Sequence, residues 1–149
     1  MSFVSWLKRF FGRTAEGAKA HVVGTARLLG ADALFLERMK RSSDEECEKL
    51  LLESIEGRHG IVVDWNASLE NILEELECLS VQEREALMLA PEILAKRRIY
   101  EVPCQLTELL QPPLRALRIV ETFGDSYFIF LVPPQLVEAF DCTNKYWSI

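Results

Sequence analysis

Apolar residues recur at helical spacing through much of the chain, and short β-branched runs interrupt that spacing at a few places. Apolar positions at i, i+3, i+4 and i+7 place one face of a helix against a core. This spacing, read with its capping and stop signals, predicts helices over 3–11, 14–29, 32–41, 43–56, 68–79 and 80–90. β-Branched runs bounded by turn residues predict strands over 59–66 and 98–103.

Three of these helices begin with clear capping signals. Asp32 precedes one of them, and a side-chain oxygen at that position accepts a backbone N–H of the first turn. The pairs Ser43–Glu46 and Ser80–Glu83 have the spacing of capping boxes, in which serine and glutamate satisfy each other's backbone N–H groups. We therefore expect helices to start directly after these residues.

The stretch "LRIVETFGDSYFIFLV", residues 117–132, predicts a β-hairpin. Gly124-Asp125 suits a two-residue turn in which glycine takes a positive φ, and this turn would pair Val120 with Ile129. The second strand is apolar on both faces, so we expect it to be central in its sheet. "PPQLVEAF" then predicts a helix with proline in its first turn.

Together these elements predict an α+β fold: N-terminal helices, then a small antiparallel sheet with a C-terminal β-hairpin, with helices packed on the sheet. A chain of 149 residues favours one domain over 1–149. Within it, residues 1–41 form a helical segment that either packs on the domain or acts as an arm.

The N-terminal stretch "FVSWLKRFFGR", residues 3–13, has a wide apolar face with cations on the other side. This face includes Phe3, Trp6, Leu7 and Phe10. Such a short helix is unstable alone, which favours docking on its own domain or on a second copy in a homodimer. The alternatives are a partner's groove and a membrane surface.

The net charge of −6 is unevenly distributed along the chain. Residues 1–41 hold eight Lys/Arg and three Asp/Glu, whereas residues 42–85 hold three and thirteen. Such a division indicates either internal complementarity or two surfaces with different partners.

The predicted helix over 68–79 is the main acidic feature. Its outward positions carry Glu70, Glu74, Glu75 and Glu77. They form either a solvated face or a docking surface for a cationic protein, where charge speeds association and selects the partner. This acidity argues against nucleic-acid binding because phosphates would be repelled.

The four cysteines, at 47, 78, 104 and 142, include no CxxC pair, and we expect no zinc site. Cys47 and Cys78 fall on apolar faces of predicted helices, which indicates buried free thiols in a reducing cytoplasm. No apolar run approaches the ~18 residues of a transmembrane helix.

No catalytic, phosphate-binding or metalloprotease motif occurs, and we expect no cofactor. Asp64 follows a predicted strand directly, which is a common place for a site residue, and His59 and Cys104 could form a dyad. These residues keep a small enzyme open as an alternative. The simpler reading is that Asp64 caps a turn and Trp65 fills the core.

Two segments, "VVDWNAS" with the acidic helix after it and "ETFGDSYFIFLVP", resemble a family of small bacterial domains of unknown function. The resemblance covers roughly residues 44 to 140 and supplies no catalytic residues. It singles out Asp64, Trp65, Asp125 and Tyr127. In size and acidity the chain also resembles immunity proteins that neutralise bacterial toxins.

These observations predict a cytoplasmic, non-catalytic protein-binding module, an immunity or adaptor protein that acts by occlusion. A membrane-peripheral accessory protein is the main alternative, and it would use the amphipathic N-terminal helix. A flat acidic surface would favour the binding module, and a cleft lined by Asp64, His59 or Cys104 would favour the enzyme.

Overall fold

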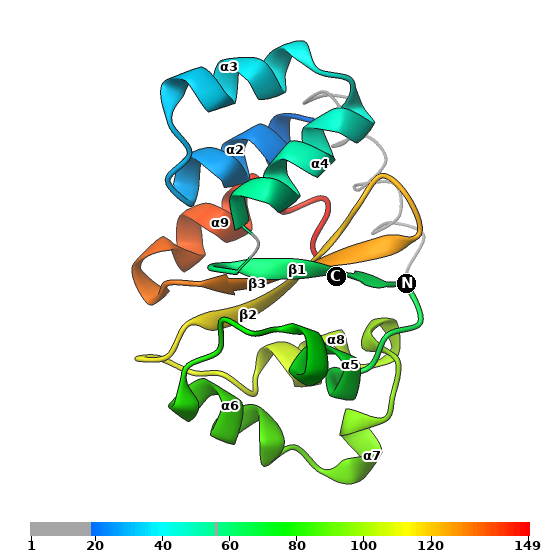
Figure 1. Ribbon diagram of the computed structural model, residues 1–149. Helices are drawn as coiled ribbons and strands as arrows, with labels where there is room; N and C mark the ends of the chain where they lie inside the picture. The colour runs from blue at the N-terminus through cyan, green and yellow to red at the C-terminus, as the bar shows by residue number, and fades with distance from the viewer. Residues whose placement is uncertain (1–18, 56) are drawn as a thin grey trace.

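The structure is a computed structural model that describes residues 19–55 and 57–149 (Figure 1). The described helices are α2 Ala20–Leu28, α3 Ala33–Arg41, α4 Asp44–Ile55, α5 Leu69–Glu75, α6 Val81–Met88, α7 Glu92–Ala95, α8 Pro103–Thr107 and α9 Val137–Thr143. The strands are β1 Gly60–Asp64, β2 Ala116–Glu121 and β3 Ser126–Val132, and the short 3-10 turns are η1 Ile99–Glu101 and η2 Pro134–Leu136. This is the α+β class that the sequence predicts.

The three strands form an antiparallel sheet in the order β1-β3-β2. Val62 of β1 and Val120 of β2 both lie opposite Phe128 of β3. The prediction of a central final strand is confirmed, and the last five residues of β3 are buried. A strand that is covered on both faces needs apolar side chains at every position, which explains the run "FIFLV".

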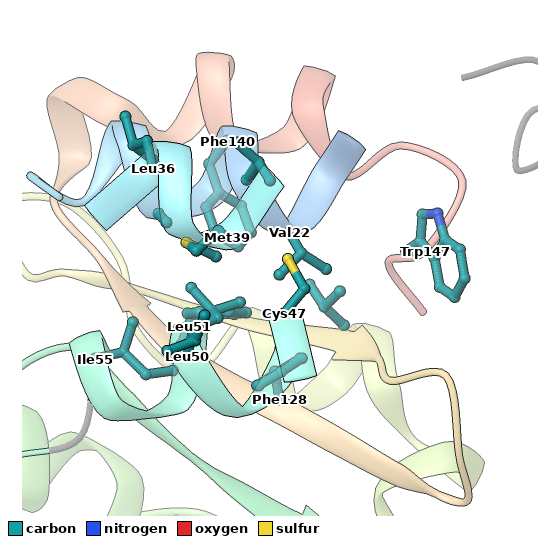
Figure 2. Packing of buried hydrophobic residues seen from close by; sticks show 14 of the residues in the cluster. Val22, Leu36, Met39, Cys47, Leu50, Leu51, Ile55, Phe128, Phe140 and Trp147 are labelled. Atoms are coloured by element: carbon teal, nitrogen blue, oxygen red, sulfur yellow. The ribbon is translucent and has the colours of Figure 1, made fainter. Parts of the chain in front are cut away.

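Helices cover both faces of this sheet (Figure 1). On one face Phe128 and Phe130 pack in a hydrophobic cluster with residues of α2, α3, α4 and α9 (Figure 2). On the other face Ile129 and Leu131 pack with residues of α5, α6, α8 and η1. The sheet is therefore the middle layer of three.

The predicted helix starts are confirmed by their hydrogen bonds. Asp32 accepts the N–H of Phe35 at 2.8 Å. Ser43 accepts the N–H of Glu46 at 3.2 Å. The Ser80 N–H donates to the Glu83 carboxylate at 2.9 Å, and the Ser80 hydroxyl accepts the Glu83 N–H at 3.1 Å.

The predicted hairpin turn is wrong. Val120 lies opposite Phe128, not Ile129, and Gly30 and Gly57 are the glycines with positive φ in the described ranges. The connection is a four-residue loop, 122–125, in which the Thr122 hydroxyl donates to the Ser126 carbonyl at 3.1 Å and accepts the Gly124 N–H at 3.1 Å. This local network replaces the two-residue turn.

The strand predicted over 98–103 is also wrong. Ile99–Glu101 is a 3-10 turn, and α8 starts at Pro103. The buried positions of this stretch recur every three or four residues, not every second one: Ile99, Val102, Leu106 and Leu110. The spacing of the buried residues is therefore helical and not that of a strand. Of the predicted strand only Arg98 forms a β-bridge, and its partner is Ser68.

The acidic helix is shorter than predicted. α5 ends at Glu75, because Leu76 turns its backbone out of the helix while burying its side chain. Arg84 stabilises this end by donating to the carbonyls of Leu73 at 3.0 Å and Leu76 at 3.2 Å. Cys78 therefore lies in a turn, partly buried, and not on a helix face.

All four cysteines are free. Cys47 is buried as predicted, whereas Cys104 and Cys142 are exposed. Within residues 19–55 and 57–149, no helix has the length and apolar character to cross a bilayer. The amphipathic stretch 3–13, with Phe3, Trp6, Leu7 and Phe10, lies outside the described residues.

Candidate functional site

The four residues singled out by the resemblance lie at one end of the sheet. Asp64 ends β1 opposite Ser126, and Tyr127 of β3 lies opposite Val63. The N–H of Trp65 donates to the backbone carbonyl of Asp125 at 3.1 Å. Antiparallel pairing of β1 with β3 thus brings together two segments that are about sixty residues apart in the sequence.

Trp65 does not fill the core, since 44% of its surface is exposed. Asp64 does cap the turn, because its carboxylate accepts the Trp65 N–H at 2.7 Å. The Trp65 ring stacks with Tyr100 at a centroid distance of 6.0 Å, and the Arg98 guanidinium lies 5.3 Å from the indole centroid. Arg98 also donates to the Tyr100 hydroxyl at 3.1 Å. Packing and cation–π contacts therefore hold an aromatic side chain at the surface.

The sequence did not single out Arg98 and Tyr100. They belong to the stretch 98–103, which the sequence predicts as a strand and not as part of a site. The contact with Trp65 follows from the bridge between Ser68 and Arg98, which depends on the tertiary fold. The one signal for this contact in the sequence is Tyr100, an aromatic residue that follows the basic residues 96–98.

A hollow of about 660 Å³ opens beside Trp65, at the hairpin end of the sheet. Four aromatic and two acidic residues line it together with small residues of the loop: Trp65, Phe123, Tyr127, Trp147, Glu121, Asp125, Thr122, Gly124 and Ser126. Trp147 forms a fixed wall, because it stacks on His21 at 4.2 Å and meets Phe123 edge-on at 5.1 Å. We call this feature the hairpin hollow.

The acidic face of α5 and the turn after it point outward. Leu69 and Ile72 are buried on the inner side, so the carboxylates project into solvent. All four are exposed, and in the described part of the chain none of them forms an ion pair: Glu70, Glu74, Glu75 and Glu77. We call this set the acidic face.

Large apolar side chains are exposed in the same helical layer. Met88 ends α6, Leu89 follows it, and Ile93 lies on α7, and all three are mostly exposed. The sequence showed Met88 and Leu89 only as the end of a helical pattern that stops at residue 90, and it did not single out Ile93. Exposed apolar side chains close together are typical of interaction surfaces.

His59 and Cys104, which the sequence offered as a possible catalytic dyad, lie away from the hairpin hollow. Cys104 is exposed on α8. His59 precedes β1, where burial and then the charges of Arg115 and Arg58 lower the pKa of its imidazole. Neither residue lines the hairpin hollow. Among the described residues, no three His, Cys, Asp or Glu side chains converge as metal ligands would.

Glu48 of α4 holds the hairpin loop in place. Its two carboxylate oxygens accept the Phe123 N–H at 3.1 and 3.0 Å. Burial raises the pKa of this carboxyl to about 7, although the Phe123 N–H lowers it and the charges of Asp44 and Glu45 raise it further. The loop that lines the hollow is thus fixed by a group that titrates near neutrality.

A pH-dependent stability follows from this raised pKa. In the folded protein the Glu48 carboxyl keeps its proton up to about pH 7. In the unfolded chain it loses that proton near the ordinary pKa of glutamate, about 4.3. Its stabilising contribution is therefore complete at acid pH and is lost as the pH rises to about 7. We expect Glu48→Gln to reduce the loss of unfolding free energy between acid and neutral pH in denaturant titrations. Parallel profiles for the two proteins would contradict the assignment.

No family model, curated protein or solved structure matches this chain.

Proposed function

We propose that this chain is a non-catalytic protein-binding module that docks a cationic protein partner on its acidic face. It would act by occlusion, as a bacterial immunity or adaptor protein does. The observation that carries the proposal is the acidic face itself, whose four carboxylates are exposed and form no ion pair within the described residues. Four free cysteines support a reducing compartment such as the cytoplasm.

The surroundings of the acidic face support this proposal. α5 contacts α7, and Arg84 of α6 binds carbonyls of α5, so the three helices share one layer. Figure 1 shows this layer below the sheet. Met88, Leu89 and Ile93 therefore offer apolar contact area in the layer that carries the charge. Apolar contacts hold a complex together, while complementary charges speed its formation.

Charge reversal on α5 tests the proposal. Glu70→Lys together with Glu74→Lys removes two negative and adds two positive charges at exposed positions. We expect the association rate with the cationic partner to fall roughly tenfold at low salt, because electrostatic steering is lost. The free energy of unfolding should change little, since both side chains are exposed.

The matched control is Glu45→Lys together with Glu53→Lys on α4. These residues are also exposed, and the change in net charge is the same, but α4 covers the other face of the sheet. Binding kinetics at low and high salt separate a local effect from a net-charge effect. The proposal is wrong if the two double variants slow association equally, or if neither does.

A further inference from the structure

The hairpin hollow lies beside the first turn of α2. Lys19 precedes this helix, and two residues later His21 stacks on Trp147 at 4.2 Å and meets Phe123 edge-on at 5.8 Å. Trp147 and Phe123 both line the hollow. The chain therefore reaches Lys19 next to this hollow.

A short connection joins Lys19 to the amphipathic stretch 3–13. Only residues 14–18 separate the two. An extended chain spans at most about 3.6 Å per residue, so Arg13 lies within roughly 22 Å of Lys19. A tether this short raises the effective concentration of the stretch at nearby surfaces to the millimolar range, and weak contacts then suffice for docking.

The aromatic lining of the hollow matches the apolar side chains of this stretch. Four aromatic side chains line the hollow, and Trp65 among them is 44% exposed. The apolar face of the stretch includes Phe3, Trp6 and Phe10. Aromatic rings that pack against one another gain stability beyond the area that they bury. Contact between the two surfaces would therefore remove apolar area of both from water.

The charges of the two surfaces have opposite signs. The stretch carries three cations, Lys8, Arg9 and Arg13. Asp125 is an exposed carboxylate in the loop that lines the hollow. Glu121 of the same lining has other interactions, so we assign the electrostatic contribution to Asp125. One exposed charge pair contributes a factor of about five or less, which leaves aromatic packing as the main source of affinity.

Two supports hold the walls of the hollow in place. Trp65 stacks with Tyr100 and donates its N–H to the Asp125 carbonyl. The loop is fixed by Glu48, whose carboxylate accepts the Phe123 N–H. A surface with fixed side chains loses less conformational entropy when a segment docks on it.

We propose that residues 3–13 dock in the hairpin hollow of their own chain. The short tether favours the same chain over a second copy. The position of Lys19 favours this hollow over the acidic face, because α2 and α5 pack on opposite faces of the sheet. Docking here leaves the acidic face open to a partner and makes the apolar face of the stretch inaccessible to a membrane.

Trp6 reports the docking in the full chain by NMR. The sequence contains three tryptophans, and the variants Trp6→Phe and Trp65→Phe assign their indole signals. We expect nuclear Overhauser effects between the Trp6 ring and the ring of Tyr127 or Trp147, at a concentration where the mass in solution is that of one chain. We also expect the Trp6 indole signal to be protected from a soluble nitroxide.

The double variant Trp6→Ser/Phe10→Ser removes two rings of the stretch. We expect the Trp65 indole signal to shift, and cleavage by trypsin after Arg13 to become at least tenfold faster, because a docked segment resists the protease until it is released. The matched control is Leu34→Ser. Leu34 is an exposed apolar residue of α3 outside the hollow, and its replacement should change neither signal nor cleavage.

The variant Asp125→Lys tests the charge contribution. It keeps the backbone carbonyl that accepts the Trp65 N–H, so the turn should persist. We expect cleavage after Arg13 to become about fivefold faster, the effect of losing one exposed charge pair. Glu138→Lys, on α9 and outside the hollow, makes the same change in net charge at an exposed position and should leave the cleavage rate unchanged.

Four results would overturn the assignment: no Overhauser effect from Trp6 to the lining, effects found only between the chains of a dimer, effects to residues of α5 or α6 instead, or equal changes in the test and control variants. Charge reversal on α5 alters no residue of the hollow. A failure of these measurements, when α5 reversal does slow the partner, would therefore reject this docking site and leave the proposed function standing.

Discussion

Phe128→Ala should lower the free energy of unfolding by about 3–5 kcal/mol, the range for truncating a buried phenylalanine. Phe128 is 1% exposed at the centre of the middle strand. Its ring contacts that of Phe130 at 5.5 Å and belongs to the cluster that includes Leu50 and Leu51 of α4 (Figure 2). Removing the ring leaves a cavity between the sheet and the helical layer that includes α4, and this cavity cannot close without moving the helices.

Denaturant titration followed by circular dichroism measures this loss. Ile93→Ala is the control, because Ile93 is mostly exposed and its truncation should cost less than about 0.5 kcal/mol. A loss below about 1 kcal/mol for Phe128→Ala would place this side chain outside the core. Equal losses for both variants would also contradict the layered arrangement.

Features set by nearby residues could be predicted from the sequence. The caps at Asp32, Ser43 and Ser80 depend on a side chain and a backbone N–H three residues apart, so the local sequence contains both partners. The central position of β3 follows from its apolar residues on both faces. These properties need no knowledge of distant contacts.

Features that depend on distant residues could not be predicted. The hairpin loop is fixed partly by Glu48, which is 75 residues away from Phe123 in the sequence. Without that contact, Gly124-Asp125 looked like a two-residue turn. The same limit applies to the candidate site, because Arg98 and Tyr100, which contact Trp65, lie more than thirty residues after it in the sequence.

Of the residues singled out in advance, Asp64, Trp65, Asp125 and Tyr127 do come together. The aromatic and acidic residues that complete the hollow, Trp147 and Glu121, were not predicted. Both positions depend on the C-terminal segment, where the Glu121 N–H donates to the Trp147 carbonyl at 2.9 Å. The local sequence around Glu121 and Trp147 contains no pattern that predicts this hydrogen bond.

A buried ion pair joins α6 to the start of β2. The Glu83 side chain is 3% exposed and the Arg115 side chain 24% exposed. Arg115 donates to the two Glu83 carboxylate oxygens at 2.6 and 2.9 Å, and also to the backbone carbonyls of Cys78 at 2.6 Å and Arg58 at 3.0 Å. The guanidinium of Arg115, at the start of β2, therefore connects α6 through Glu83, the turn after α5 through Cys78 and the turn before β1 through Arg58.

The pair determines how Glu83 titrates. Burial alone would raise the pKa of this carboxyl, but hydrogen bonds from Arg115 and Ser80 outweigh burial and lower it. A lowered pKa means that Glu83 stabilises the fold above the pKa of an unfolded glutamate, about 4.3. This contribution disappears as the pH falls through the folded pKa.

Arg115→Ala should therefore destabilise the protein most at neutral pH, by about 3 kcal/mol. This is the lower end of the range for breaking a buried pair, because Arg115 is partly exposed. In the variant, burial raises the pKa of the Glu83 carboxyl, so the deficit should shrink as the pH falls from neutral through that raised pKa toward the lowered pKa of the native pair. The hydrogen bonds from Arg115 to the carbonyls of Cys78 and Arg58 are lost at every pH. Their loss accounts for the part of the stability deficit that remains at acid pH.

The double variant Glu83→Ala/Arg115→Ala separates the two contributions. If the ion pair stabilises the fold, the double variant should lose less than the sum of the two single losses, because neither charge is then buried without its partner. Denaturant titrations of the four proteins at neutral and acid pH give the coupling energy directly. Additive losses, or a deficit of Arg115→Ala that does not change with pH, would show that Arg115 acts through its backbone carbonyl contacts alone.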